Sequence, residues 1–486
     1  MSDFQSLFQH HLERRGLTIY RLSKELQIDR STLYQVHSGA RLPTVQIFQR
    51  MAAYFELSSQ EEREWLEAWK QTRLSPKHYR LRRQVERCIQ TLEQCASSAP
   101  LQFSARPQDL NEETAEASLF LEGRSRVFHL LQAVLESQLS AHEKGPVDIH
   151  LPSSFFSEPI RESSGLLSLC GSPQVRQLFS LSPLGGGPEE DAAPMLAILN
   201  EILDRFFSNG GGRGYIPYFY YRPGGDAAYA SDLFPYYVIA GGRVLLLSAD
   251  LDRCLLLTDP QAAAAYRQQF DLTLGRASPL FRCYDSPVQA MRDISPAGEA
   301  PPQSSVHFFR QPCLVMYTDR QIVSHALYPD CPDRERLVDF VVDRYGNGRI
   351  FGLDYYNFFT LQGTASFLAD GVMQEFPGNL VRPLPREDRL TLVRRLRDFA
   401  RLQGGNVHCI NPELISVPEG VLIDLCFGRQ LIFSKSRPEA LNYLVVSEPG
   451  LVRSFLDYFR ALPSTPGVYS REESAGVLDK LLEQYS

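Results

Sequence analysis

Several side chains between residues 18 and 41 can form the hydrogen bonds and ion contacts that bind a nucleic acid. Asp29 is a good N-cap, so the sequence predicts a helix from about residue 30 to residue 37. Such a helix turns hydroxyl and amide groups outward, where they can bond to base edges, and places cations beside phosphates. The candidate DNA-binding residues are Thr18, Arg30, Ser31, Thr32, Tyr34, Gln35 and Arg41.

These polar side chains need a small scaffold to hold them. The apolar residues of the same segment recur at spacings of two to five positions, so they can close one core while the polar residues face outward. Ser23 is small where two helices would cross. The sequence therefore predicts two short amphipathic helices joined by a tight turn. The apolar positions are Leu22, Leu26, Ile28, Leu33 and Val36.

The segment from about residue 4 to residue 55 resembles the lambda-repressor-like, or Xre-type, helix-turn-helix family. Four short patterns carry the resemblance: Thr-x-x-x-Leu-Ser from Thr18 to Ser23, Ile28-Asp29 before Ser31-Thr32-Leu33, Gly39, and Pro43-Thr44. The family places its second motif helix in the major groove of double-stranded DNA and binds as a homodimer. Carried over, the resemblance implies base-edge roles for Ser31, Thr32 and Gln35, and phosphate roles for Thr18, Arg30 and Arg41.

Three residues depart from the family pattern. Ile19 replaces a glutamine at the head of the first motif helix, and His37 replaces an acidic residue. Gln27 replaces the turn glycine, so it must adopt a left-handed conformation that is unfavourable for a side chain, or change the turn. The fold tolerates these changes, but the operator sequence is not predicted.

Charge is distributed unevenly along the chain. Residues 1–90 hold 15 basic against 10 acidic residues, whereas the remaining residues hold 35 against 47. The positive excess at the N-terminal end favours contact with a phosphate backbone. The alternative interpretation of the same helices is a hairpin that binds another protein.

The length of 486 residues leaves room for further domains, and 43% hydrophobic residues suffice for their cores. We expect an all-α helix-turn-helix domain at 1–73, a helical linker at 74–113, and a larger α/β (α+β) module. In the linker, the segment from Cys95 to Glu113 loses apolar periodicity, which predicts a domain boundary. With no apolar run of about 18 residues and no signal sequence, we expect a cytoplasmic protein that does not contact membranes.

A pattern of strand, hairpin, strand and helix occurs twice in the larger module. Gly241-Gly242 separates two apolar runs, and Pro260 begins a helix that would close at Phe270. A similar order surrounds Gly428-Arg429 and Pro449. This predicts two diverged α/β halves at 114–300 and 301–486. The pattern also resembles degenerate phospholipase D-like sensor modules.

No catalytic signature is complete. Active phospholipase D-like enzymes need His-x-Lys-x4-Asp twice, and the nearest segment, from His142 to Asp148, has the wrong spacing. The glycine-rich run at 209–214 lacks the lysine of a phosphate-binding loop. His307, His325 and His408 are isolated in the sequence, and Cys88 and Cys95 have no histidine at ligand spacing. We therefore expect no enzyme activity, metal or cofactor.

An aromatic cluster gives the larger module a candidate ligand site. Nine tyrosine and phenylalanine residues lie between residues 215 and 237, and strand alternation would turn some of them outward. The candidate ligand-binding residues are Arg213, Tyr218, Tyr220 and Arg222, in which the arginines could bind an anion. The alternative interpretation is a sheet core and dimer contact.

Two functions agree with these features. The first is a sequence-specific transcriptional regulator whose larger module senses a small molecule or a protein. The second is an enzyme or defence effector that is tethered to DNA or regulates its own synthesis. The lack of paired catalytic residues in the sequence favours the first.

Overall fold

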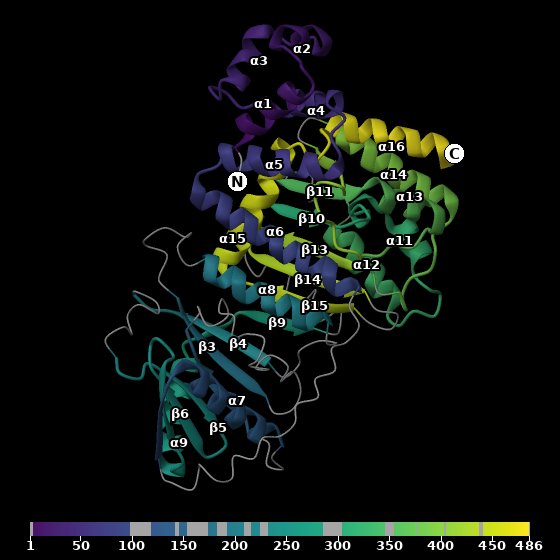
Figure 1. Ribbon diagram of the computed structural model, residues 1–486. Coiled ribbons are helices and arrows are strands. Elements are labelled where there is room, and N and C mark those ends of the chain that lie inside the picture. The colour runs from purple at the N-terminus through teal and green to yellow at the C-terminus, as the bar shows by residue number, and fades with distance from the viewer. Residues whose placement is uncertain are drawn as a thin grey trace.

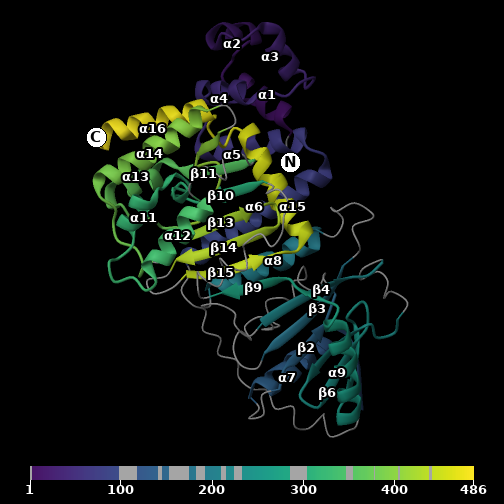
Figure 2. The ribbon, with the colours of Figure 1, turned by 180° about the vertical axis from the view of Figure 1, so that it is seen from behind.

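The computed structural model describes residues 3–97, 118–140, 145–152, 174–181, 192–208, 215–223, 232–284, 304–345, 354–376, 378–402, 405–436 and 441–485. The chain is mixed α/β, with a group of N-terminal helices and two mixed β-sheets. Both ribbon views place the N-terminal helices and the first sheet at opposite ends, with the second sheet between them (Figures 1 and 2). Within these ranges, every helix is too short or too polar to cross a lipid bilayer.

The N-terminal end is a compact bundle of five helices, here called the headpiece. A side-chain oxygen of Asp3, Thr18, Asp29, Thr44 or Ser58 caps the start of each helix. Trp65 lies at the centre of the core and packs edge-on against Phe4, Phe8 and Phe48. The helices are α1 (Phe4–Arg14), α2 (Ile19–Leu26), α3 (Arg30–His37), α4 (Val45–Tyr54) and α5 (Ser59–Arg73).

The next helix, α6 (Pro76–Ser97), lies within the predicted helical linker but is packed into a core. Val85, Cys88, Ile89 and Leu92 are all buried, because their spacing forms one apolar stripe. That stripe packs against α8 (Ala192–Ser208) and α15 (Pro449–Ala461). The predicted linker at 74–113 is therefore corrected at its helical part, which belongs to the core of the larger module. Residues 98–117 lie outside the described residues.

The first sheet has eight strands in the order β1-β7-β6-β5-β2-β3-β4-β8. Strands β2, β3 and β4 are parallel, and the other neighbours pair antiparallel. The predicted hairpin is confirmed, because Gly241 turns the chain with φ of +60° between β5 and β6. Its strands are β1 (Ser118–Glu122), β2 (Val147–His150), β3 (Val175–Leu181), β4 (Tyr215–Tyr221), β5 (Tyr236–Ala240), β6 (Arg243–Leu247), β7 (Arg253–Leu257) and β8 (Ser278–Pro279). Helices α7 (Arg124–Ser140) and α9 (Pro260–Leu274) accompany it.

The second sheet has seven strands in the order β12-β11-β10-β13-β14-β15-β9. Strands β10, β11 and β12 are parallel, and the rest pair antiparallel. The strands are β9 (Phe281–Tyr284), β10 (Ser305–Phe308), β11 (Tyr355–Thr360), β12 (Asn406–Ile410), β13 (Val421–Cys426), β14 (Gln430–Ser436) and β15 (Leu441–Val446). In the part of the chain that the structure describes, the remaining α-helices are α11 (Arg320–Ala326), α12 (Arg334–Tyr345), α13 (Leu361–Asp370), α14 (Arg386–Arg401) and α16 (Arg471–Tyr485).

Sheet membership changes earlier than the expected boundary near residue 300. Strand β9 precedes that position but pairs with β15 in the second sheet. It occupies the edge position that β1 occupies in the first sheet. The change therefore falls between β8 and β9, at Leu280. The sequence pattern does not show this change of sheet, because the residues of an edge strand do not indicate which strand they pair with.

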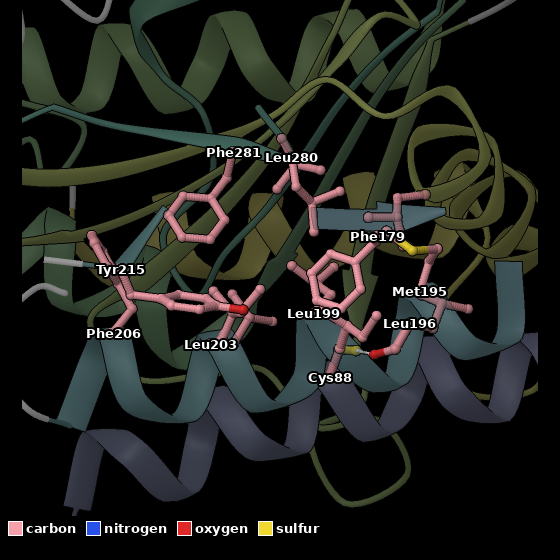
Figure 3. Close-up of a cluster of buried hydrophobic side chains, with 14 of the residues drawn as sticks. Cys88, Phe179, Met195, Leu196, Leu199, Leu203, Phe206, Tyr215, Leu280 and Phe281 are labelled. Atoms are coloured by element: carbon pink, nitrogen blue, oxygen red, sulfur yellow. Dashed lines mark hydrogen bonds between the residues drawn. The ribbon is translucent and has the colours of Figure 1, made fainter. Parts of the chain in front are cut away.

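One hydrophobic core connects the two sheets. Figure 3 shows α8 directing Leu199 and Leu203 toward Phe179 and Tyr215 of the first sheet, close to Phe281 of β9. In the same view α6 runs along α8, where the Cys88 thiol donates to the main-chain oxygen of Leu196 at 3.6 Å. The sheets therefore do not form two independently packed domains.

Candidate nucleic-acid interface

Helices α2 and α3 are joined by a turn at residues 27–29. Gln27 has φ of +48° and ψ of +43°. It therefore adopts the left-handed conformation that favours glycine, the residue that it replaces in the family pattern. Ile28 is buried, and the carboxylate of Asp29 then accepts hydrogen bonds from the main-chain N–H groups of Ser31 (2.7 Å) and Thr32 (3.3 Å). The turn and cap together fix the direction in which α3 leaves the bundle.

The exposed face of α3 carries most of the predicted base-reading side chains. Arg30, Ser31, Tyr34 and Gln35 are exposed, and Thr32 is half-buried. Leu33 and Val36 on the opposite face are buried in the headpiece core. The Ser31 hydroxyl donates to Asp29, so its oxygen is free to accept a bond from a base amino group.

A cation–aromatic cluster lies at the N-terminal end of this face. The Arg30 guanidinium lies over the rings of Tyr20 (5.6 Å) and Tyr34 (5.3 Å) and donates to the Tyr34 hydroxyl at 3.3 Å. This hydrogen bond raises the pKa of Arg30. The Lys24 ammonium also lies over the Tyr20 ring, 4.7 Å from its centroid. Tyr20 and Lys24 were not among the predicted site residues, although both rings of the cluster are exposed, at 51% and 47%.

The predicted phosphate contacts lie before α2 and after α3. Thr18 caps α2 by accepting from the main-chain N–H of Arg21 at 3.3 Å, which leaves its hydroxyl proton for a phosphate oxygen. Arg41 is exposed beyond the end of α3, and its main-chain N–H donates to the Gln35 oxygen at 3.2 Å. Thr18 and Arg41 are both exposed.

Helix α1 supports the C-terminal end of α3. The side-chain amides of Gln5 and Gln9 donate to the main-chain oxygen of His37 at 3.2 and 3.0 Å. Gly39 follows with φ of +72°, and a β-carbon there would lie 2.4 Å from the Gln5 side chain. These bonds anchor the exposed helix to the bundle at both ends, which favours a preorganised surface.

Replacing Gln27 with glycine should stabilise the headpiece by about 1 kcal/mol, because glycine adopts the left-handed conformation without the steric cost of a side chain. Urea unfolding followed by tryptophan emission measures this, since both tryptophans of the chain, Trp65 and Trp69, lie in α5. The matched control is Gln71→Gly, on the exposed side of α5, which should destabilise by a similar amount. Equal effects of the two changes would contradict the left-handed turn.

The second candidate site lies on the first sheet. Tyr218 and Tyr220 point to the α9 side of β4 and pack against a cluster that includes Ile239 and Phe270. The Tyr220 hydroxyl contacts His150 Nε2 at 3.4 Å. The main-chain N–H of Arg222 bonds to Leu181, and Arg213 lies outside the described residues. The alternation is confirmed, but the two tyrosines are half-buried in packing contacts and do not line an open site.

Each of the three histidines that are isolated in the sequence has a hydrogen-bond partner. His307 Nδ1 lies 2.9 Å from Asp424, and His325 Nδ1 lies 2.6 Å from Asp388. His408 Nδ1 lies 3.0 Å from the Tyr469 main-chain oxygen, and burial lowers the pKa of its ring. Asp148, the acid of the incomplete signature, is buried in ion pairs, while His142 lies outside the described residues.

A cavity of about 730 Å³ lies between the headpiece and the part of the chain that contains the second sheet. Helix α5, helix α6 and the segment at 412–416 line it. Lys70 on α5 forms an ion pair with Glu86 on α6 at 2.6 Å, beside Arg83, which also contacts Glu86 at 3.2 Å. Leu414 packs against the headpiece core. The cavity is thus built from both parts of the chain.

Comparisons with known proteins give no further guidance to this site. A scan against models of known protein families finds no match. A search of curated proteins finds no significant relative.

Proposed function

We propose that this protein is an Xre-type helix-turn-helix regulator that binds double-stranded DNA by inserting α3 into the major groove. The observation that carries the proposal is the pair α2 and α3 itself. Its left-handed turn, Asp29 cap and buried apolar face hold a polar, cationic face outward. A helix of this size fits the width of the major groove.

In this docking, the candidate side chains of the headpiece have two roles, which are contact with base edges and contact with phosphates. Ser31, Thr32 and Gln35 contact base edges, and Tyr34 lies beside them on the same exposed surface. Thr18 and Arg41 contact phosphates on either side of the groove. Arg30 also contacts phosphate, held in place by the two tyrosine rings. The family resemblance adds binding as a homodimer to a two-fold operator.

We assign the sensing role to the larger module. Apart from the extra edge strand β8, both sheets have the same strand order, which supports the interpretation that they are diverged copies of one unit, similar to degenerate phospholipase D-like sensor modules. A small molecule in the cavity between α5, α6 and the segment at 412–416 would contact both the headpiece and the larger module. Arg63 donates to the Glu413 oxygen at 3.0 Å across this junction, so a ligand there would change the attachment of the headpiece.

Two alanine substitutions in the headpiece should weaken DNA binding in different ways. Gln35→Ala should relax the preference for one base and reduce discrimination by about 1–3 kcal/mol. Arg41→Ala should weaken binding to all duplexes alike and reduce the slope of log K against log salt by about 1, because one phosphate contact is lost. Fluorescence anisotropy with matched and single-mismatch duplexes, at several salt concentrations, measures both effects.

The matched control is Arg276→Ala, an exposed arginine after α9 at the opposite end of the molecule. It should leave affinity and salt dependence unchanged. If Gln35→Ala and Arg41→Ala also left both quantities unchanged, α3 would not be the DNA-binding helix.

A further inference from the structure

Three different metal-ligating side chains come together in the interior beside the second sheet. His307 lies on β10, Cys313 lies in the segment that follows, and Glu375 lies after α13. One ligand atom of each side chain lies within 4.8 Å of the others. His307 and Cys313 are buried and Glu375 is partly buried. None of the three lines the cavity at the headpiece junction.

Neighbouring strands hold the histidine and the cysteine in position. In the sheet register, Asp424 on β13 and Asn357 on β11 lie on either side of His307. Asp424 accepts from His307 Nδ1 at 2.9 Å, which directs Nε2 toward the interior, where it lies 3.3 Å from the Gln311 main-chain oxygen. A carboxylate on the far nitrogen of a ligating histidine is typical of metal centres.

Main-chain bonds fix the other two ligands. Asn357 accepts from the Cys313 N–H at 3.2 Å and donates to the Cys313 oxygen at 3.1 Å. One oxygen of Glu375 accepts from the N–H groups of Leu314 and Val315, each at 3.1 Å, and the carboxylate also interacts with the Cys313 thiol. Gln311 bonds to the segment before Glu375, through the Val372 oxygen and the Gln374 N–H, both at 2.9 Å.

The charge balance of this group favours a divalent cation. A doubly charged cation compensates one thiolate and one carboxylate, and neutral imidazole completes a set with no net charge. The Tyr355 hydroxyl is also buried and interacts with the Cys313 thiol. It supplies a further polar group at the site.

We propose that His307 Nε2, Cys313 Sγ and the Glu375 carboxylate bind one Zn²⁺, with water in the fourth coordination position. Mixed nitrogen, sulfur and oxygen ligands suit this borderline-soft ion, whereas Mg²⁺ and Ca²⁺ require oxygen ligands. On binding, the S–H bond of Cys313 breaks, the Zn–S bond forms and the proton passes to water. The ion would fasten β10 and the 3-10 helix Val315–Tyr317 to the segment after α13. This proposal is independent of DNA binding.

The test measures zinc in the full-length chain purified without added metal or chelator, by elemental mass spectrometry and by native mass spectrometry. We expect about one zinc ion per chain. Cys313→Ser should lose it, and Asp424→Asn should weaken zinc affinity by about 10–100-fold in a competition titration with Zn²⁺, because the histidine loses its orienting carboxylate. Cys409→Ser, a buried thiol of the same core cluster, is the matched control and should retain zinc.

The wild-type chain keeps the proposal falsifiable if a variant does not fold. Its melting temperature should fall after chelation and recover when Zn²⁺ is added back. Absence of zinc in the purified chain, together with no binding of added Zn²⁺ to the chelated and still folded chain, would overturn the proposal. Equal zinc content in the wild type and in folded Cys313→Ser would also overturn it.

Discussion

Trp65→Ala should unfold the headpiece and abolish DNA binding while both sheets stay folded. Trp65 is 1% exposed and its indole packs against Phe4, Phe8, Phe48 and Phe55. Truncating such a side chain costs about 3–5 kcal/mol. The free energy of unfolding of a bundle of this size is at the low end of about 5–15 kcal/mol. The loss is therefore comparable with the total stability of the headpiece.

Urea unfolding monitored by tryptophan emission checks this prediction, because Trp69 remains as a reporter in α5. Circular dichroism reports the two sheets in the same samples. The control is Trp65→Phe, which keeps an aromatic ring in the core and should lower the stability less. Unchanged unfolding of Trp65→Ala would show that this side chain does not hold the headpiece together.

Asp148→Ala should destabilise the first sheet by about 3 kcal/mol. Asp148 is 0% exposed on β2 and accepts from Arg176 Nε at 2.6 Å and from Arg267 Nε at 3.3 Å. Removing one member of a buried ion pair costs about 3–5 kcal/mol, and the lower end applies because the Arg267 side chain is 32% exposed. Since Arg267 lies on α9, the change also releases that helix from the sheet.

Hydrogen exchange followed by mass spectrometry should show faster exchange in β2, β3 and α9 of Asp148→Ala, and unchanged exchange in the headpiece. Asp271→Ala is the matched control. Asp271 contacts the same Arg176 at 3.1 Å, but its side chain is 52% exposed, so its loss should cost less than about 1 kcal/mol. Equal exchange in the two variants would contradict the buried ion pair as the anchor of α9.

Local features of the fold were predictable from the sequence. The Asp29 cap, the left-handed Gln27 and the proline-initiated helix at Pro260 each depend on a few adjacent residues. The same is true of the hairpin at Gly241. In these cases backbone sterics and capping bonds determine the structure, and no distant contact is required.

Long-range partners were not predictable. The apolar stripe of α6 is visible in the sequence, but its partner α8 lies far along the chain, so the helix was predicted as part of a linker. The predicted boundary at residue 300 put the segment of β9 in the first half for the same reason, although it pairs with β15 of the second sheet.

At the candidate sites too, contacts between residues that are distant in the sequence were not predictable. The exposed polar residues of α3 follow from helical spacing, whereas the contact of Arg30 with Tyr20 depends on how α2 and α3 cross. His307 is isolated in sequence and gains Asp424, Cys313 and Glu375 as neighbours when β10, β13 and two segments outside the sheet meet. Pairing across strands is determined by the whole sheet, so sequence spacing alone could not show this cluster.

The most direct test of the DNA-binding proposal is a selection of duplexes from a random pool by the full-length chain, in dilute and in physiological salt. The account predicts that the wild-type chain enriches one family of sequences, and that the Gln35→Ala chain enriches a broader family. A folded wild-type chain that retains no duplex, even in dilute salt, would contradict the account.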